Sequence, residues 1–244
     1  MTKKDKMKNT FLDILYPRRC PVCHDIPVPG TQKICSGCRE RLRPVTGPRC
    51  FKCSKPLKDP EQEYCSDCSR RTHLFDQGIG IFPYNTLLQE SLFKLKYGKR
   101  QEYGVFYGEL AAAYAETQIR CWEIDYLVPI PLHRKRLEKR GYNQAELIAE
   151  ALGKRVNLPV KKKLMKRKIN TKPQKDLNPE ERLKNIRGAF TAAERLNGGN
   201  ILLIDDIYTT GATLNQAAAT LKKAGAQRVY FLVIAIGSET RVVS

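Results

Sequence analysis

The chain has 244 residues, of which 41% are hydrophobic and 28% are charged, so it can bury a core in one or two domains and is not a disordered polyelectrolyte. Its 44 Lys and Arg against 25 Asp and Glu give a formal net charge of +19, which favours a polyanionic partner or substrate, although such a charge also aids solubility. The longest apolar run, residues 229–236, is far too short to span a bilayer, so we expect no membrane-spanning segment.

The amino-terminal stretch contains no secretory signal. Basic residues precede a short apolar core at residues 11–15, but Asp13 interrupts that core, which is too short and too polar for a signal peptide. Nine cysteines in a chain without an export signal favour metal binding over disulfides, because the cytosol is reducing. We therefore expect a cytoplasmic protein.

Eight of the cysteines form a repeat with an offset of 30 residues between its halves. Each half is a CxxC pair, eleven residues and a second CxxC pair, the ligand spacing of a structural zinc ribbon. The first half spans residues 20–38 and the second half spans residues 50–68. The cysteines are Cys20, Cys23, Cys35 and Cys38, then Cys50, Cys53, Cys65 and Cys68. We predict two structural zinc ions, each closed by four thiolates and without an open position for catalysis.

The spacing leaves alternatives for how the cysteines are paired and what chemistry they carry. The gap from Cys38 to Cys50 is also eleven residues, so the spacing allows each ion either one consecutive half or ligands from both halves. A redox dithiol is the alternative chemistry for the CxxC pairs. His24 and His73 lie close enough in sequence to replace a ligand, but eight thiolates make them bystanders. The ninth cysteine, Cys121, is predicted to be buried.

The composition changes at about residues 70–74. Before them lies the cysteine repeat, and after them the sequence alternates strand and helix patterns without cysteine clusters. We therefore predict two domains, residues 1–72 with the double zinc ribbon and residues 73–244 with an α/β fold built on a parallel sheet flanked by helices.

A predicted strand at residues 126–130 runs into a strongly basic turn at residues 131–142. Asn143 and Glu146 then have the spacing of a cap and capping box on a helix that continues to Lys154. Five of the residues from His133 to Arg136 and from Glu138 to Arg140 are Lys or Arg. This turn would stabilise a pyrophosphate, or it is simply a solvated basic turn.

Residues 161–187 are predicted to form a mobile loop. Pro173 and Pro179 interrupt them, and residues 161–175 contain eight Lys or Arg. A basic loop of this kind could close over a bound anion and exclude water from it.

The apolar run at residues 201–204 predicts a strand buried on both faces of a parallel sheet. A helix at residues 214–224, closed by Gly225, and a strand at residues 228–236 complete a βαβ unit. Ligands bind beyond the carboxyl ends of the strands in such units.

The segment between the strand and the helix has the chemistry of a phosphate site. Backbone N–H groups of residues 209–213 precede the helix, where free donors and the helix dipole stabilise an anion. Gly211 allows close approach of the backbone, and threonine hydroxyls add donors. Asp205 and Asp206 are acceptors that suit ribose hydroxyls and the magnesium ion of a sugar phosphate. The nucleotide P-loop pattern GxxxxGK[ST] is absent.

The sequence ILLIDDIYTTGAT at residues 201–213 resembles the signature of type I phosphoribosyltransferases, which bind 5-phosphoribosyl 1-pyrophosphate (PRPP). The resemblance implies that Asp205 and Asp206 contact the ribose as catalytic residues, and that magnesium accompanies PRPP. The residues implied to wrap the 5-phosphate are Thr209, Thr210, Gly211, Ala212 and Thr213. Those implied to hold the pyrophosphate are Leu132, His133 and Arg134.

Three further stretches resemble the ComF (ComFC) family. They are LVPIPLHRKRLEKRGYNQAELIA at residues 127–149, the amino-terminal CxxC series, and the pattern formed by Arg167, Thr171, Gln174, Leu177, Arg182, Asn185 and residues 188–190. The resemblance spans residues 11–236. It implies a zinc-bearing, phosphoribosyltransferase-like protein that acts in DNA uptake during natural transformation, with single-stranded DNA and a ComFA-like ATPase as partners.

Two functions follow from the resemblance. One is a phosphoribosyltransferase, in the glycosyltransferase class, that moves phosphoribosyl from PRPP to an unidentified acceptor and releases pyrophosphate. The other is a non-catalytic module that binds single-stranded DNA and a motor protein and uses PRPP only as a ligand. The aromatic candidates for stacking on bases are Phe51, Tyr64, Tyr97 and Tyr103. A metal-thiol redox protein is the third and weakest alternative.

Overall fold

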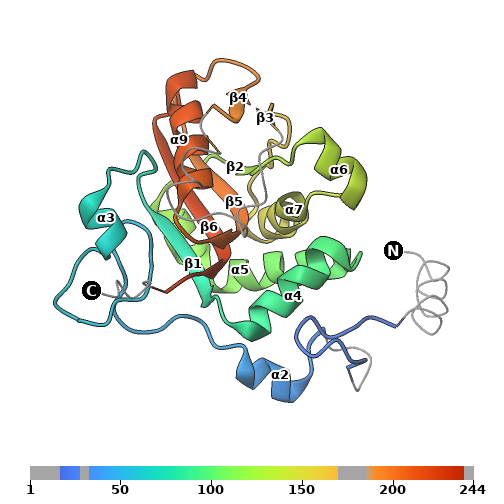
Figure 1. The fold of residues 1–244 in the computed structure, drawn as a ribbon. Coiled ribbons are helices and arrows are strands. Elements are labelled where there is room, and N and C mark those ends of the chain that lie inside the picture. Colours follow the sequence, from blue (N-terminus) through green and yellow to red (C-terminus); the bar gives the residue numbers. More distant parts are fainter. Residues whose placement is uncertain (1–16, 28–32, 170–185, 187, 239–244) are drawn as a thin grey trace.

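The structure is a computed structural model that describes residues 17–27, 33–169, 186 and 188–238. Its centre is a four-stranded sheet with the strand order β1-β6-β5-β2 (Figure 1). The strands are β1 (Gly78–Pro83), β2 (Tyr126–Pro129), β5 (Asn200–Tyr208) and β6 (Arg228–Ile236). All neighbouring strands run parallel. The predicted α/β fold with a parallel sheet is confirmed.

Helices cover both faces of this sheet. One face carries α4 (Thr86–Tyr97), α5 (Gln101–Cys121) and α7 (Gln144–Val156), and the other carries α9 (Ala212–Ala224). Successive residues of a strand point to opposite faces, so Leu202 and Ile204 of β5 enter the first core while Ile201 and Leu203 enter the second. This arrangement explains why the sequence of β5 is apolar without alternation.

Strand β5 is longer than the sequence predicts. Its pairing with β2 ends at Ile204, but its pairing with β6 continues to the Tyr208–Ile236 pair. Asp205 and Asp206 therefore lie within a strand on the β6 side and beyond the end of β2 on the other. This one-sided pairing places the two carboxylates at the carboxyl edge of the sheet, past the last residue of β2.

The smaller elements differ from the predictions in two places. The basic turn contains a helix, α6 (Arg134–Arg140), which ends at Gly141 in the left-handed conformation with φ 83°. In the predicted mobile loop, β3 (Met165–Arg167) pairs antiparallel with β4 (Phe190–Ala192), so its first part is regular structure. The family-pattern residues Thr171, Gln174, Leu177, Arg182 and Asn185 lie outside the described residues.

The prediction for Cys121 is wrong, because its side chain is exposed. It is the last residue of α5, and the next residue, Trp122, takes the buried position. Trp122 stacks on Tyr230 with ring centroids 4.4 Å apart. The sequence alone does not show which of the two neighbours is buried, and in the structure the larger side chain, that of Trp122, enters the core.

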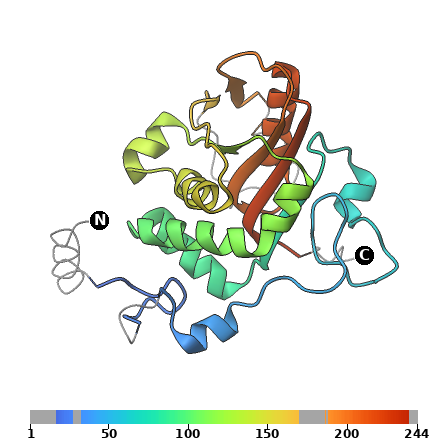
Figure 2. The same cartoon turned by 180° about the vertical axis from the view of Figure 1, so that it is seen from behind.

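The two halves of the cysteine repeat pack on different sides of the sheet. The first half contains α2 (Ser36–Arg41) and the second half contains α3 (Ser66–Arg70). Figures 1 and 2 show α2 beneath α4 and α5, and α3 beside β1, well away from α2. Cys20 and Cys38 of the first half belong to the core that contains α4 and α5, whereas Cys50 and Cys53 of the second belong to the core that contains α9.

Within the described ranges, no helix combines the length and the apolar composition needed to cross a membrane.

Candidate functional site

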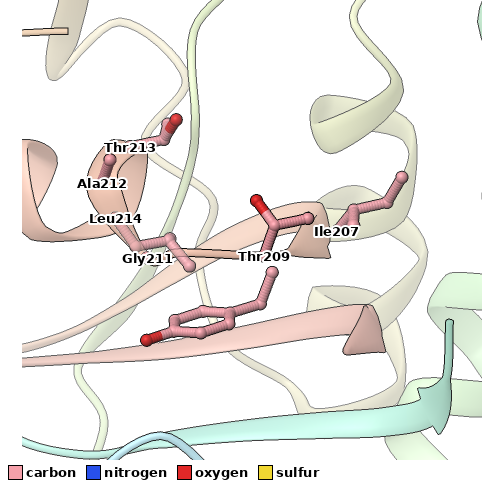
Figure 3. A pocket seen from close by; sticks show the side chains of 7 residues that line it. Ile207, Thr209, Gly211, Ala212, Thr213 and Leu214 are labelled. Atoms are coloured by element: carbon pink, nitrogen blue, oxygen red, sulfur yellow. The ribbon is translucent and has the colours of Figure 1, made fainter. Parts of the chain in front are cut away.

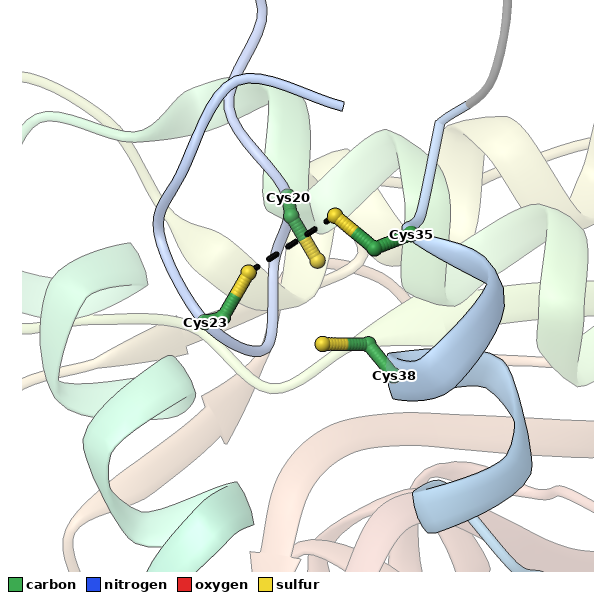
Figure 4. A group of neighbouring side chains, drawn as sticks. All are labelled: Cys20, Cys23, Cys35 and Cys38. Atoms are coloured by element: carbon green, nitrogen blue, oxygen red, sulfur yellow. Dashed lines mark hydrogen bonds between the residues drawn. The ribbon is translucent and has the colours of Figure 1, made fainter. Parts of the chain in front are cut away.

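The structure resolves the ligand pairing that the spacing left open. The side chains of Cys20, Cys23, Cys35 and Cys38 form one cluster (Figure 4), and those of Cys50, Cys53, Cys65 and Cys68 form a second. Within each cluster all Sγ atoms lie within 4.8 Å of one another. Each consecutive half therefore forms one four-thiol group, and interleaving is excluded.

These two groups fit zinc. A Zn–S bond of about 2.3 Å in a tetrahedron places sulfur atoms roughly 3.8 Å apart, and the Sγ–Sγ distances are 3.7 Å for Cys23–Cys35 and 3.6 Å for Cys53–Cys65. Burial and the neighbouring thiols raise the pKa of Cys35 to about 11 and of Cys38 to about 12. A dication would offset that effect, because it stabilises the thiolate form of its ligands. The sites are structural, since four thiolates leave no coordination position for a substrate.

The acidic pair, Asp205 and Asp206, lies at the carboxyl edge of the sheet. Asp206 is 4% exposed, and both of its oxygens have partners. Lys96, in the last turn of α4, forms an ion pair with Oδ2, and Gln144, the first residue of α7, donates from Nε2 to Oδ1 at 3.2 Å. Two helices from one face of the sheet therefore meet at this carboxylate.

The two carboxylates have opposite protonation tendencies. Burial alone would raise the pKa of Asp206, but the charge of Lys96, aided by hydrogen bonds, outweighs burial, so the pKa of Asp206 lies below its usual value. Burial and the charge of Asp206 raise the pKa of Asp205 well above its usual value. The environment therefore favours the negative charge on Asp206 and disfavours ionisation of Asp205.

Two cationic side chains from separate elements act on the acidic pair. Lys96 of α4 forms an ion pair with Asp206. Burial and the charge of Arg136, in α6, lower the pKa of Arg167, in β3, to about 10, while the charge of Asp205 acts in the opposite direction. Lys96 and Arg167 provide a suitable field for a ligand that carries several negative charges.

The phosphate loop, residues 209–213, follows directly. Gly211 has φ 72° and precedes the first residue of α9, and Figure 3 shows the loop at the junction of β5 and α9. A shallow pocket is lined here by Ile207, Tyr208, Thr209, Gly211, Ala212, Thr213 and Leu214. The Thr210 hydroxyl is buried, and it has no hydrogen-bond partner among the described residues. Backbone N–H groups at a helix amino terminus, beside the Thr210 hydroxyl, have the chemistry that suits an anion.

Gly211 is required by its neighbour as well as by its backbone angle. A Cβ at this position would lie 2.5 Å from the Tyr208 hydroxyl and 2.8 Å from its Cζ. The Tyr208 ring therefore lies directly against the loop backbone. Any other residue would push the loop away from the ring.

The candidate pyrophosphate residues lie at the start of α6. His133 caps this helix, and its Nδ1 accepts from the Lys135 N–H at 3.3 Å. Arg134 donates from Nε to Glu138 at 2.7 Å and its side chain is 88% exposed, so it lies over its own helix. Arg136 of the same helix is half-buried, and its charge acts on Arg167 of β3.

Comparisons with known proteins agree with both parts of the structure. Residues 11–69 match the model of a double zinc ribbon domain, and residues 137–244 match that of a phosphoribosyl transferase domain. The competence protein ComFC of Bacillus subtilis is 32% identical over 201 residues, which cover 80% of this chain and 80% of that protein. The chain belongs to the ComF family.

Other members of the ComF family show the same extent of similarity. Competence protein F of Haemophilus influenzae is 28% identical over 219 residues, 86% of this chain and 93% of that protein. The DNA utilization protein YhgH of Escherichia coli K12 is 24% identical over 219 residues, 88% of this chain and 96% of that protein. A purine phosphoribosyltransferase of Pyrococcus horikoshii aligns with a TM-score of 0.34 at 14% identity, over 57% of this chain and 94% of that one, a likeness too weak to add to the assignment.

Sequence reasoning missed the partners of Asp206 in this ComF-family chain. Lys96 has no signal in the sequence, because nothing in an amphipathic helix marks which lysine turns inward. Gln144 had a weak signal, since it follows the predicted cap residue Asn143. The cap itself is confirmed, because Asn143 Oδ1 accepts from the Ala145 N–H at 3.1 Å.

The aromatic candidates of the ComF-family chain divide into two groups. Tyr103 is fully buried in the core, so its proposed contact with bases is wrong. Phe51 and Tyr64 are exposed and lie edge to face at 6.2 Å. Tyr97 is 57% exposed, and the Arg140 guanidinium lies 5.2 Å from its ring centroid. Only the last three remain available for stacking.

Proposed function

We propose that this protein binds PRPP at the acidic pair and the phosphate loop and transfers its phosphoribosyl group to an acceptor. The observation that carries the proposal is the order of groups at one sheet edge. A carboxylate pair is followed within one turn by a glycine-containing loop at a helix amino terminus. This order matches the ribose and the 5-phosphate of one ligand.

The reaction is a displacement at C1 of the ribose. The bond from C1 to the pyrophosphate oxygen breaks and its electron pair leaves with pyrophosphate, while the acceptor forms a new bond to C1 and loses a proton. Positive charge develops on the ribose ring, and the carboxylate of Asp206, whose pKa is lowered, would support it. Magnesium bound with PRPP would neutralise charge on the leaving pyrophosphate.

The residues divide the work by their surroundings. Lys96 and Gln144 occupy both oxygens of Asp206, so the carboxyl of Asp205 is the more available group for ribose hydroxyls. The phosphate loop, Thr209 to Thr213, would hold the 5-phosphate. Leu132, His133 and Arg134 would hold the pyrophosphate if Arg134 leaves Glu138.

The names of the relatives suggest the biological setting. Two are competence proteins and one is a DNA utilization protein, and we propose that this protein acts in the cytoplasm in DNA uptake. Its partners there would be single-stranded DNA and a ComFA-like ATPase. The net charge of +19 is consistent with a polyanionic partner.

A test measures pyrophosphate release from PRPP with and without single-stranded DNA, beside the Asp205→Asn/Asp206→Asn double variant. We expect release that depends on an acceptor and is lost in the double variant. PRPP binding without turnover, over a broad set of base and nucleic-acid acceptors, would contradict the transferase.

The second candidate function is a non-catalytic DNA-binding module that uses PRPP as a ligand. Exposed aromatic residues favour it, above all Tyr97 beside Arg140. Binding of an oligo-dT strand and of an abasic strand of equal length, each over a range of salt concentrations, tests it. Stacking predicts a preference for oligo-dT that Tyr97→Ala abolishes, whereas Tyr114→Ala, at an exposed tyrosine packed on Phe82, leaves the preference unchanged.

A further inference from the structure

Tyr208 lies between the phosphate loop and the second half of the zinc ribbon. Its side chain is 1% exposed. The ring stacks on Phe231 with centroids 5.1 Å apart and meets the edge of Phe75 at 6.3 Å. On one side it touches the backbone at Gly211, where a Cβ would lie 2.5 Å from its hydroxyl. The backbone of the phosphate loop therefore packs directly on the Tyr208 ring.

On its other side the ring faces the second half. Cys50, Cys53 and Cys65 share one core cluster with Tyr208. Lys55, which lies between the two cysteine pairs, is 3% exposed, and its Nζ lies 5.8 Å from the Tyr208 ring centroid. Lys55 also forms an ion pair with Asp67 at 2.5 Å. A buried cation therefore connects the ribbon to this ring.

The hydroxyl of Tyr208 has an unused hydrogen bond. It is buried, and within the part of the chain that the structure describes it has no partner. Cys50, Cys53 and Cys65 share its core cluster, and Cys68 packs against that cluster, so the thiols of the second half are the sulfur groups of its own core. A buried hydroxyl without a partner is costly, and a neutral thiol is a weak acceptor.

Zinc would change the acceptor. Bound to the metal, Cys53 is a thiolate that carries charge and accepts hydrogen bonds strongly. Hydrogen bonds from the surroundings to metal ligands orient these ligands and raise metal affinity. Tyr208 shares the core cluster of Cys50, Cys53 and Cys65, and its hydroxyl has no other partner among the described residues, so it is available to supply one.

We propose that Tyr208 is a positioning residue that couples the second zinc site to the phosphate loop. Its hydroxyl donates to the zinc-bound thiolate of Cys53, and this bond fixes the ring beneath Gly211. Zinc in the second site thereby holds the loop in the form that binds phosphate. The inference rests on the proposed function only in naming phosphate as the ligand of the loop.

The first half offers a matched control. Tyr103 is also a fully buried tyrosine next to a cysteine cluster, and its hydroxyl meets His24 Nδ1 at 3.0 Å. It lies in the core on the other face of the sheet, away from the phosphate loop. Tyr208→Phe and Tyr103→Phe therefore remove the same atom beside the two halves.

The experiment uses the full-length, zinc-loaded chain. Zinc loss to a chromophoric chelator measures metal retention. Titration with inorganic phosphate and with PRPP measures the affinity of the loop for each ligand. In Tyr208→Phe we expect one of the two zinc ions to be bound about 10-fold more weakly, and phosphate affinity to fall about 10-fold. Tyr103→Phe should change neither phosphate nor PRPP affinity.

Unchanged zinc retention in Tyr208→Phe would overturn the coupling, even if the wild type binds no PRPP, so failure of the proposed function stays distinguishable. Weaker zinc binding with wild-type phosphate affinity would also overturn it. Phenylalanine keeps the stacking on Phe231, so folding is expected to survive, and an unfolding temperature near that of Tyr103→Phe checks this. An equal loss of phosphate affinity in both variants would indicate general loosening and contradict the proposal.

Discussion

Around their first cysteine pairs, the two halves of the zinc ribbon share backbone features, but their surroundings differ. His24 and Ser54, 30 residues apart, both have φ 67°. The Cys20 N–H donates to Asp25 O at 2.7 Å, and the Cys50 N–H donates to Lys55 O at 2.9 Å. At this equivalent position Asp25 is exposed, while Lys55 is buried against Tyr208. Metal coordination thus dictates the local backbone, and the side chains between the cysteines decide where each half packs.

Each half lies next to a different part of the candidate site. The first half packs with α4 and α5, and α4 carries Lys96 to Asp206. The second half lies beneath the phosphate loop, through Tyr208. The double ribbon therefore supports the acidic pair from one side and the loop from the other.

Loss of one zinc ligand should have the largest effect. We expect Cys20→Ser and Cys50→Ser each to lose one zinc ion and several kcal/mol of stability, because metal binding supplies much of the folding free energy of such a ribbon. Only Cys50→Ser should also lose phosphate binding. Metal quantification, thermal unfolding and phosphate titration check this, and equal phosphate affinity in both variants would break the comparison.

Lys96→Met sharpens the comparison on the side of the first half. It removes the partner of the buried Asp206, and we expect a loss at the lower end of about 3–5 kcal/mol, since Lys96 is 21% exposed. Chemical denaturation at neutral pH measures it. Phosphate affinity at the loop should persist, and its loss would show that the two sides are not independent.

The same variant has a pH signature. The pKa of Asp206 is lowered in the folded state, so its ion pair stabilises the protein above the usual aspartate pKa of about 4 and this contribution disappears as pH falls below that value. Lys96→Met should shrink this acid dependence. The pH dependence of Asp205 has the opposite sign, because its pKa is raised in the folded state. Its protonated carboxyl stabilises the protein at low pH, and this contribution is lost as pH rises. Asp205→Asn should therefore be more stable than the wild type at neutral pH.

Gly211→Ala tests the contact between the loop and Tyr208, with Gly141→Ala as the control. Both glycines have positive φ, 72° and 83°, but a Cβ meets nothing within 4 Å at Gly141. We expect about 1 kcal/mol of backbone strain at Gly141, and about 2 kcal/mol more at Gly211 from overpacking. Thermal unfolding distinguishes them, and equal losses would show that the ring yields.

Lys55→Met and Lys33→Met compare one ion pair from each half and should have the smallest effects. Lys55 is buried and pairs with Asp67, whereas Lys33 is 42% exposed and pairs with Glu109. We expect Lys55→Met to lower the free energy of unfolding by about 2 kcal/mol, which is less than for a fully buried pair because Asp67 is 31% exposed. Lys33→Met should lower it by at most about 1 kcal/mol. A reversed order in denaturant titrations would contradict the role given to the second half.

Features set by nearby residues were predictable. The spacing of the cysteines predicts two four-thiolate groups, and the apolar run before Asp205 predicts a buried strand with a loop and a helix behind it. Both depend on geometry within about 20 residues. The end of β5 was misplaced because it is determined by pairing with β6, whose partner residues, such as Ile236 for Tyr208, lie farther along the chain.

By itself, the sequence determined the class of the sheet, the two four-cysteine groups and the place of the candidate phosphate loop, because each arises from local spacing and periodicity. The tertiary structure decided which cysteines group together, that Lys96 and Gln144 occupy Asp206, and that the second half supports the loop through Tyr208. Gln144 and Asp206 are 62 residues apart in sequence. Contacts over such separations depend on how whole helices pack, so they cannot be predicted from the residue type of a single side chain.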